Sequence, residues 1–283
     1  KKSMLVYSGA SSPASMTLSD TIEGIGCIAR DSVQHTGADI LFLSDTGVRS
    51  LGRTIQEKSL PLNDLSKNVR TDLTSLVPLQ TNAIKSLYSA DEAFYLLTLP
   101  DSDTTYCFDM RSPLQDGSQR ATTWSGLHPL AFTTTEAGDI YFGLSSGIVK
   151  YSGYLDGTAN YQMRYFSNPM DFGNASNLKF LKKFNITIIG GQNTKSTLNW
   201  GYDYSTNFTK QVFTLTGSIN AGEYGVSEYN TTAEYTATAI INTPKVNTSG
   251  NGEVVTIGLE TEINDTSFSI QKIDIHAILG RLI

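Results

Sequence analysis

A hairpin pattern that recurs in the first half of the chain limits the possible folds most strongly. Residues 39–51 read DILFLSDTGVRSL, and residues 139–151 read DIYFGLSSGIVKY. In both segments an acidic residue opens an apolar run, a polar turn with glycine follows (Gly47 and Gly147), and a second run begins with a β-branched residue. Glycine reaches the positive φ that such turns need without steric cost. Each segment is therefore predicted to form an antiparallel hairpin.

A degenerate copy of the pattern lies between these two. Residues 92–100 are an apolar run, residues 101–104 a polar turn, and residues 105–109 a returning strand. Hairpins of one design spaced by about fifty residues are typical of radially repeated β architectures, because one sheet cannot bury both of its faces alone. We therefore predict a β-propeller part over residues 1–160. Its blades are expected near residues 25–51, 83–110 and 129–151.

The stretch between the first two blades has a helical pattern. Apolar residues recur there at spacings of three and four: Leu62, Leu65, Val69, Leu73 and Leu76. This is the helical period, with Asn63 or Asp64 as the N-cap and Pro78 as the stop. We predict an amphipathic helix near residues 62–76 that packs on the propeller, the alternative being a helix that docks a partner.

The repeat ends near residue 160, and long alternating strands begin. These are expected at residues 178–189, 196–203, 211–215, 233–241, 253–262 and 267–279, with glycine-containing turns between them. Alternation with regular turn signals is typical of a β-sandwich or jelly roll. The predicted fold class is therefore all-β: a β-propeller with an inserted amphipathic helix, followed by a β-sandwich or jelly-roll-like domain over residues 161–283.

Composition excludes several classes of protein. The net charge is −6, so the chain has no basic footprint for gripping nucleic acid. Cys27 and Cys107 sit in apolar runs and are predicted to be buried free thiols rather than a disulfide. No stretch has the length of a membrane-spanning helix, and no signal peptide is visible. The chain starts with Lys-Lys-Ser, so we expect that residues precede Lys1 in the native protein.

The titratable residues form no recognisable catalytic or metal-binding motif. His35, His128 and His276 are scattered over different predicted elements, without the spacing of metal ligands. Asp101 and Asp103 alternate in a turn, but the third acidic position and the glycine of a calcium loop are absent, so a solvated hairpin tip is expected.

Two further acidic motifs are discounted as sites. Asp91 and Glu92 could be imagined as a glycosidase pair, but adjacent strand residues point to opposite faces. The segment 44–47, Ser-Asp-Thr-Gly, is similar to the Asp-box turn of sialidases, with the aspartate one place early and the following aromatic missing. We therefore predict no catalytic, cofactor-binding or metal-binding residues and a protein that is not an enzyme.

Four aromatic residues cluster in one predicted strand and its turn: Trp200, Tyr202, Tyr204 and Phe208. Aromatic residues on a sheet face can stack on sugars. In a tyrosine-rich β domain they more often fill the core or an interface, which is the interpretation favoured here.

The first blade also carries a resemblance to a known family. Residues 26–33, G-C-I-A-R-D-S-V, followed by the hairpin at residues 39–51, resemble a propeller blade of the tail nozzle proteins of short-tailed bacteriophages, also called tail tubular protein B. The D-L-S at residues 64–66 lies where these proteins commonly place an inserted helix. The ending, I-G-L-E at residues 257–260 and T-S-F-S-I-Q-K-I-D-I-H-A-I-L-G-R at residues 266–281, is similar to the closing strands of that family.

The resemblance implies a structural role in the virion. Family members form a homohexameric ring below the portal and the adaptor protein, at the distal tail, through which genomic DNA leaves the capsid. The implied partners are further copies of the chain, the tail adaptor protein and tail fibres, while DNA passes through the lumen without sequence-specific binding. An acidic lumen would repel phosphates, and turn residues such as Asp45, Asp101, Asp103 and Asp116 are candidates to line it.

Other interpretations stay open at this point. A closed propeller needs at least four blades, so a further blade is expected from before Lys1, from strands that the pattern does not reveal, or from the C-terminal domain. The alternative function is a carbohydrate-binding or glycoside-processing propeller with an accessory sandwich domain. It predicts that acidic residues and aromatics converge at the propeller mouth or on one sandwich face. A cell-surface β scaffold is the third interpretation.

Overall fold

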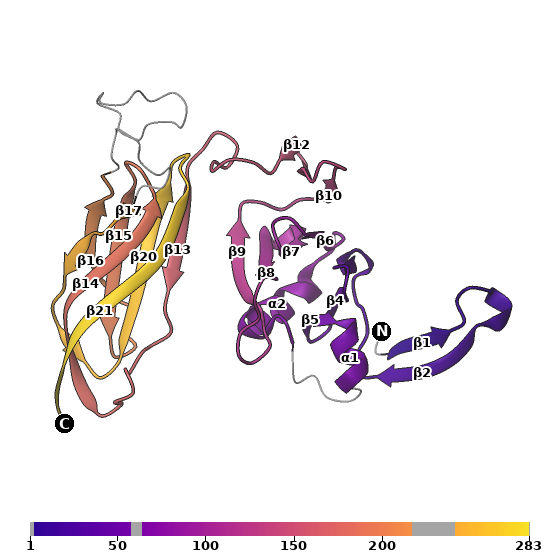
Figure 1. The fold of residues 1–283 in the computed structure, drawn as a ribbon, viewed down its shortest axis with the longest axis horizontal. Coiled ribbons are helices and arrows are strands. Elements are labelled where there is room, and N and C mark those ends of the chain that lie inside the picture. The colour runs from indigo at the N-terminus through magenta and orange to yellow at the C-terminus, as the bar shows by residue number, and fades with distance from the viewer. Residues whose placement is uncertain (1–2, 58–63, 217–240, 283) are drawn as a thin grey trace, which may run out of the picture. The chain divides into compact units, whose positions relative to one another are not determined.

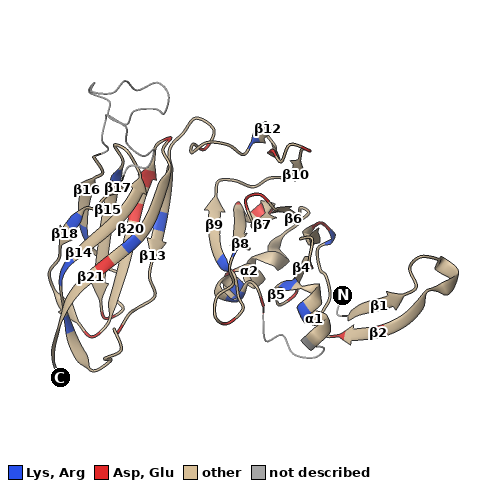
Figure 2. Ribbon diagram, viewed as in Figure 1, with Lys and Arg blue, Asp and Glu red and all other residues tan. Residues whose placement is uncertain are grey.

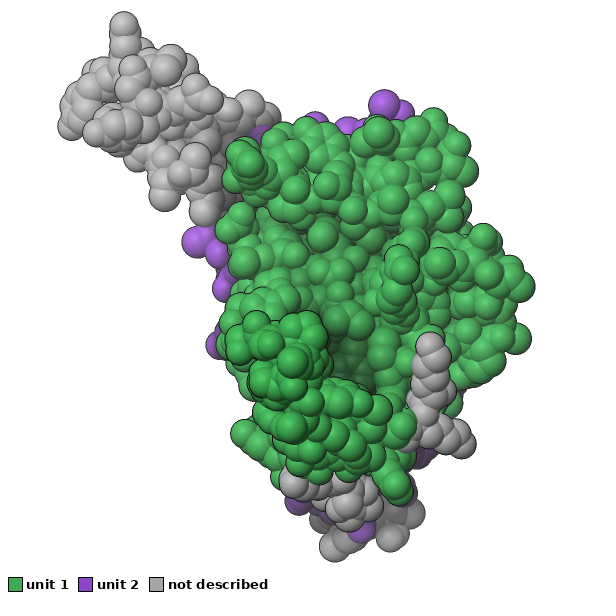
Figure 3. Space-filling view, turned by 90° about the vertical axis from the view of Figure 1, so that its right-hand side faces the viewer, with its two compact units in different colours: residues 1–151 green, residues 152–283 purple. Residues whose placement is uncertain are grey.

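The computed structural model describes residues 3–57, 64–216 and 241–282. It is 51% strand and 11% helix, so the predicted mostly β architecture is confirmed. The chain divides into two compact units, Lys1–Tyr151 and Ser152–Ile283 (Figures 1 and 3). The boundary predicted near residue 160 falls inside the second unit.

Unit 1 contains three antiparallel sheets and an N-terminal hairpin within its described residues. The first sheet is β3 (Gln34–His35), β4 (Ile40–Ser44) and β5 (Gly47–Ser50). The second is β6 (Lys85–Ser89), β7 (Phe94–Leu99), β8 (Thr104–Asp109) and β9 (Arg120–Ser125). The third is β10 (Ala131–Thr134), β11 (Ile140–Leu144) and β12 (Gly147–Lys150). The second sheet thus extends beyond the segment 83–110, because β9 adds a fourth strand.

The two best-defined hairpins turn as their glycines predict. Gly47 has φ of 133° and Gly147 has φ of 147°, both in the region that favours glycine. A Cβ atom at Gly47 would also collide with the side chains of Ser66 and Asp64, which close over the β4–β5 turn. The turn therefore needs glycine for its backbone conformation and for the space above it.

The sheet β6–β9 is the middle layer of unit 1. On one face, Tyr95 and Leu97 of β7 belong to a core shared with Leu43 of β4. On the other face, Phe94 and Leu96 belong to a core shared with β11. All six residues of β7, FYLLTL, are buried, because the strand is covered on both faces.

The helical segment between the first two sheets is shorter than its pattern suggests. The α-helices are α1 (Leu51–Glu57) and α2 (Arg70–Leu76), with a single 3-10 turn, η3 (Lys67–Val69), before α2 and another, η4 (Val77–Leu79), after it. The helix predicted near residues 62–76 therefore begins at Arg70, and Leu62 and Asn63 lie outside the described residues.

Asp64 does not cap a helix, which corrects the expected start of this segment. Its Oδ1 accepts hydrogen bonds from the backbone N and the Oγ of Ser66 at 2.8 and 2.6 Å, and its Oδ2 accepts one from Arg70 at 2.7 Å. This carboxylate is fully buried and holds a turn over the β4–β5 hairpin. Leu65 and Leu73 are buried in the core of unit 1, so the segment packs on the sheets.

The N-terminal hairpin pairs β1 (Ser3–Ser8) with β2 (Thr17–Glu23). The pattern of residues 16–25 is ambiguous in the sequence, and in the structure most of this segment is strand β2. The segment TLSDTIE has few apolar residues to mark a strand, since only Ile22 is buried among them. Cross-strand pairing with β1 defines this strand.

Unit 2 is built from two antiparallel sheets. One has the order β13 (Tyr161–Phe166), β20 (Val255–Ile263), β15 (Lys195–Tyr202) and β16 (Thr209–Thr214). In the other, β14 (Asn177–Gly190) pairs with β17 (Ile241–Asn242), β18 (Lys245–Asn247), β19 (Asn251–Gly252) and β21 (Phe268–Leu282). The strand expected at residues 233–241 lies outside the described residues, apart from its last position.

Both sheets of unit 2 contribute to one hydrophobic core. Phe184 and Ile186 of β14 belong to the same buried cluster as Leu198 of β15 and Leu259 of β20. The alternation predicted for these strands is the reason, because every second side chain points to the shared core. The long strands β14 and β21 run side by side along most of their length (Figure 1).

Candidate functional site

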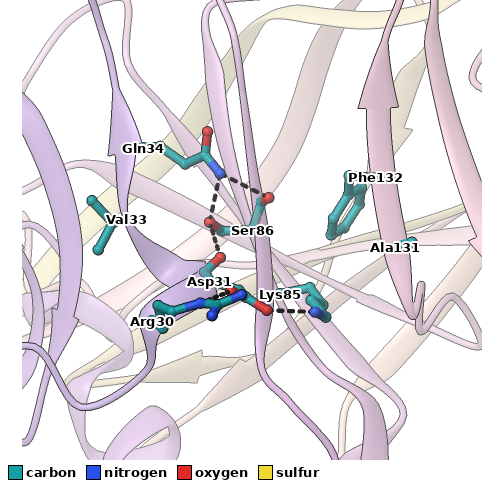
Figure 4. A pocket seen from close by; sticks show the side chains of 8 residues that line it. All are labelled: Arg30, Asp31, Val33, Gln34, Lys85, Ser86, Ala131 and Phe132. Carbon is teal, nitrogen blue, oxygen red and sulfur yellow. Dashed lines mark hydrogen bonds and ion pairs between the residues drawn. The ribbon is translucent and has the colours of Figure 1, made fainter.

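A cavity opens where the first strands of the three unit 1 sheets meet. Strand β6 lies beside both β3 and β10. The cavity is open to solvent and has a volume of about 360 Å³. Eight residues line it (Figure 4): Arg30, Asp31, Val33, Gln34, Lys85, Ser86, Ala131 and Phe132.

The single 3-10 turn η2 (Arg30–Ser32) presents the charged residues. Ser32 is fully buried and anchors this turn. Its Oγ donates to the carbonyl of Ala29 at 2.7 Å and accepts from the backbone N of Leu43 at 2.9 Å. The turn is therefore fixed to β4, and its charged side chains stand at the cavity wall.

Three charged groups form one network on this wall. The Asp31 carboxylate accepts a hydrogen bond from the Lys85 ammonium and one from the Arg30 Nε, the latter at 3.0 Å (Figure 4). The hydrogen bond from Lys85, followed by that from Arg30, lowers the pKa of Asp31 below its usual value. Two cations and one carboxylate give these lining residues a net charge of +1.

A second set of hydrogen bonds joins the first two sheets beside the cavity. The Gln34 amide nitrogen donates to the carbonyl and the Oγ of Ser86 at 3.0 and 3.1 Å, and the Ser86 Oγ donates to the Asp31 carbonyl at 2.8 Å. Among the described residues, the side-chain oxygen of Gln34 has no partner. This oxygen can accept a hydrogen bond from a bound molecule.

Apolar side chains complete the lining of the cavity. Ala131 and Phe132 of β10 stand on one side, and Val33 stands on the other, next to η2 (Figure 4). The Phe132 ring packs edge-on against Phe142, with ring centroids 5.4 Å apart and an interplanar angle of 88°. This contact orients the Phe132 ring, so the cavity combines charged side chains with an oriented aromatic ring.

The aspartates of the β7–β8 turn take part in hydrogen bonds and an ion pair. Asp101 accepts hydrogen bonds from the backbone and side chains of Thr81 and Asn82, and the bonds from Asn82 contribute most to lowering its pKa. Asp103 pairs with His128 instead. Over the described residues, no three His, Cys, Asp or Glu side chains are grouped to hold a metal ion.

The other acidic candidates also stay apart from the cavity. Asp91 and Glu92 lie in the turn before β7, where the backbone N of Glu92 donates to Ser89. In the segment 44–47, the Oγ atoms of Ser44 and Thr46 accept hydrogen bonds from the Arg49 guanidinium at 2.8 to 3.1 Å. The hydroxyl groups of that turn therefore hold the guanidinium of the buried Arg49 in place.

The remaining histidines each make a hydrogen bond, and the two cysteines are free thiols. His35 accepts a hydrogen bond from the backbone N of Gly37, and His276 bonds to the Asn185 amide. Both cysteines are free and partly buried. Burial is the main cause that raises the pKa of Cys107 to about 11, so this thiol is a poor nucleophile at neutral pH.

The four clustered aromatics of unit 2 separate into different roles. Trp200 is buried in the core and donates to the Ser249 carbonyl at 3.0 Å, as the Tyr202 hydroxyl does at 2.9 Å. Tyr204 is 74% exposed, and Phe208 packs on Phe166. They do not form a single platform for a ligand.

The residues of the cavity were not singled out from the sequence. Arg30, Gln34, Lys85 and Phe132 come from three separate segments, and no single motif contains them all. The one signal in the sequence was their position, since they lie on or just before the first strand of each repeat. Finding them required knowing that these first strands meet.

No known protein family matches the chain, and no curated protein is significantly similar to it. Within the described parts of the chain, no helix is long and apolar enough to cross a membrane. The functional argument therefore depends on the geometry of the fold and the cavity.

Proposed function

We propose that the chain is a non-catalytic structural subunit of a phage tail nozzle, part of the tail tube that conducts genomic DNA during ejection. In this proposal unit 1 is the β-propeller part and unit 2 a β-sandwich domain. The resemblance at residues 26–51 supports this assignment, and so does the arrangement of the unit 1 sheets.

The observation that carries the proposal is the arrangement of three consecutive sheets. They pack face to face through two separate cores, and their first strands β3, β6 and β10 are neighbours. Propeller blades are arranged in this way around a central channel. An arc of blades also fits a subunit that is completed by further protein.

The last sheet of the arc offers a free face. Ala131, Gly143 and Ile148 lie opposite one another on β10, β11 and β12, on the side away from the β6–β9 sheet. Ile148 is 80% exposed. A neighbouring subunit or a further blade would bury this side chain, which a ring assembly provides.

The charges of the chain are compatible with a conduit for DNA. The net charge is −6, and the Lys and Arg residues are dispersed over both units (Figure 2). Asp45 and Asp116 are both exposed. A surface of this kind repels phosphates and releases DNA, whereas a basic groove would retain it.

The native mass of the full-length protein tests this proposal, measured by light scattering alone and with its adaptor protein. We expect a ring of about six subunits. Ile148→Asp should weaken this assembly, whereas Val212→Asp, at a 63% exposed position of unit 2, should not. A persistent monomer that cleaves a glycan would contradict the proposal.

A further inference from the structure

We propose that the cavity between β3, β6 and β10 binds one acidic monosaccharide, a pyranose that carries a carboxylate such as a hexuronic acid. This binding activity goes beyond the structural role and does not depend on it. Three features carry the inference: an available cation, an oriented aromatic ring, and a polar group that can accept from a hydroxyl.

The carboxylate of the ligand would bind Arg30. Only its Nε is used, by Asp31, and the two terminal nitrogens have no partner among the described residues. The side chain is 95% exposed, so these nitrogens are available to a second carboxylate. A guanidinium binds a carboxylate through paired hydrogen bonds, which gives orientation as well as affinity.

The net charge of Arg30, Asp31 and Lys85 favours a ligand that carries a single negative charge. Asp31 neutralises one of its two neighbours, Arg30 and Lys85, which leaves one positive charge uncompensated. A monoanion completes the balance. A phosphate dianion would bring a second negative charge close to the Asp31 carboxylate, where it is repelled.

The ring of the sugar would lie on Phe132. This side chain and Ala131 stand on one side of the Gln34–Ser86 pair, and Val33 stands on the other side (Figure 4). The C–H face of a pyranose packs on an aromatic ring, while its hydroxyls point sideways. The free side-chain oxygen of Gln34 would accept a hydrogen bond from one hydroxyl.

The cavity is open to solvent, and its volume of about 360 Å³ accommodates one sugar unit. Among the described residues that line the cavity, Asp31 is the one carboxylate, and two cations hold it, whereas glycoside hydrolysis uses a pair of carboxyl groups.

The test compares three probes on the full chain by saturation-transfer NMR: D-glucuronate, D-glucose and acetate. Glucuronate has the carboxylate and the ring, while each of the others has one of them. We expect glucuronate to bind with a dissociation constant on the order of 1 mM. Glucose and acetate should each bind about tenfold more weakly, because each loses one set of contacts.

Matched variants locate the binding. Arg30→Gln should weaken glucuronate about tenfold, and Phe132→Leu should weaken glucuronate and glucose by similar factors. Arg164→Gln, which removes an exposed arginine of unit 2, should change nothing. Tryptophan fluorescence would confirm that each variant is folded.

Several results would overturn this proposal. Equal affinity for acetate and glucuronate would mean that the ring is not recognised, and equal affinity for glucose would remove the carboxylate contact. An unchanged affinity in Arg30→Gln would place binding elsewhere. None of these outcomes affects the native mass of the protein, so failure here is distinguishable from failure of the structural role.

Discussion

Leu73 provides the sharpest test of how α2 belongs to unit 1. Its side chain is fully buried in the core shared by the first two sheets. Leu73→Ala removes three carbon atoms, worth about 2.4 kcal/mol at ~0.8 kcal/mol each. A residual cavity adds about 1 kcal/mol if the surroundings do not collapse. We therefore expect a loss of about 3 kcal/mol in the free energy of unfolding of unit 1.

The two tryptophans make this loss measurable, because each unit has one. Trp124 stacks on Tyr151 in unit 1, with ring centroids 6.2 Å apart, whereas Trp200 is in the core of unit 2. Replacing Trp200 by Phe in parent and variant leaves Trp124 as the fluorescent reporter of unit 1. With a slope of about 2 kcal/mol per molar urea, the midpoint should fall by about 1.5 M.

The control is a second leucine of the same region. Leu79 lies in η4 and is 66% exposed, so Leu79→Ala should change the free energy by less than about 0.5 kcal/mol. An unchanged urea midpoint for Leu73→Ala would refute the reasoning. It would mean that α2 is not part of the cooperative core and would restore the interpretation of a docking helix.

Three further predictions concern backbone space, thiol reactivity and pH. Gly190 and Gly173 have similar positive φ, 80° and 77°. A Cβ atom at Gly190 would collide with the Ser267 backbone, whereas one at Gly173 would meet open space. Gly190→Ala should therefore lower the free energy of unfolding of unit 2 by about 2 kcal/mol more than Gly173→Ala, as measured by Trp200 fluorescence. Labelling of Cys107 should accelerate about tenfold per pH unit between pH 8 and 10, because its pKa is raised to about 11, and a plateau by pH 9 would contradict this. Since the pKa of Asp31 is lowered in the fold, its ion pairs stabilise unit 1 at neutral pH and are lost on acidification. Asp31→Asn should thus lower the urea midpoint at pH 7 but not below the folded pKa, and a pH-independent difference would exclude this mechanism.

The hairpins were predictable because local chemistry determines them. An apolar run, a turn with glycine and a second apolar run are enough to place β4–β5 and β11–β12. Strand β7 was equally clear, since a strand buried on both faces is continuously apolar. Here the local preference and the tertiary environment favour the same structure.

The sequence was least informative where strands are polar. Strand β9 reads RATTWS, and Trp124 is its only large apolar residue. Pairing with β8 along its full length makes it a strand. The helical period at residues 62–76 misled in the opposite way, since the buried side chain of Asp64 holds a turn at the start of that segment.

The cavity was beyond the reach of sequence patterns for a different reason. Arg30 and Lys85 are ordinary surface residue types, and they are 55 positions apart by their numbers. Their shared partner Asp31 becomes visible only when β6 is placed beside η2. A site made from three segments carries no periodic or spacing signal.

The layered arrangement of unit 1 determines the order in which its parts open. The sheet β6–β9 has a neighbour on both faces, whereas β10–β12 is covered on one face and has Ile148 exposed on the other. Opening of the outer sheet breaks one interface, and opening of the middle sheet breaks two. The backbone amides of β12, in the outer sheet, should therefore exchange with solvent earlier than those of β7, in the middle sheet. A neighbouring subunit that covered the exposed face of β10–β12 would slow amide exchange in β12 and leave exchange in β7 unchanged. The ratio of the two exchange rates would therefore measure assembly.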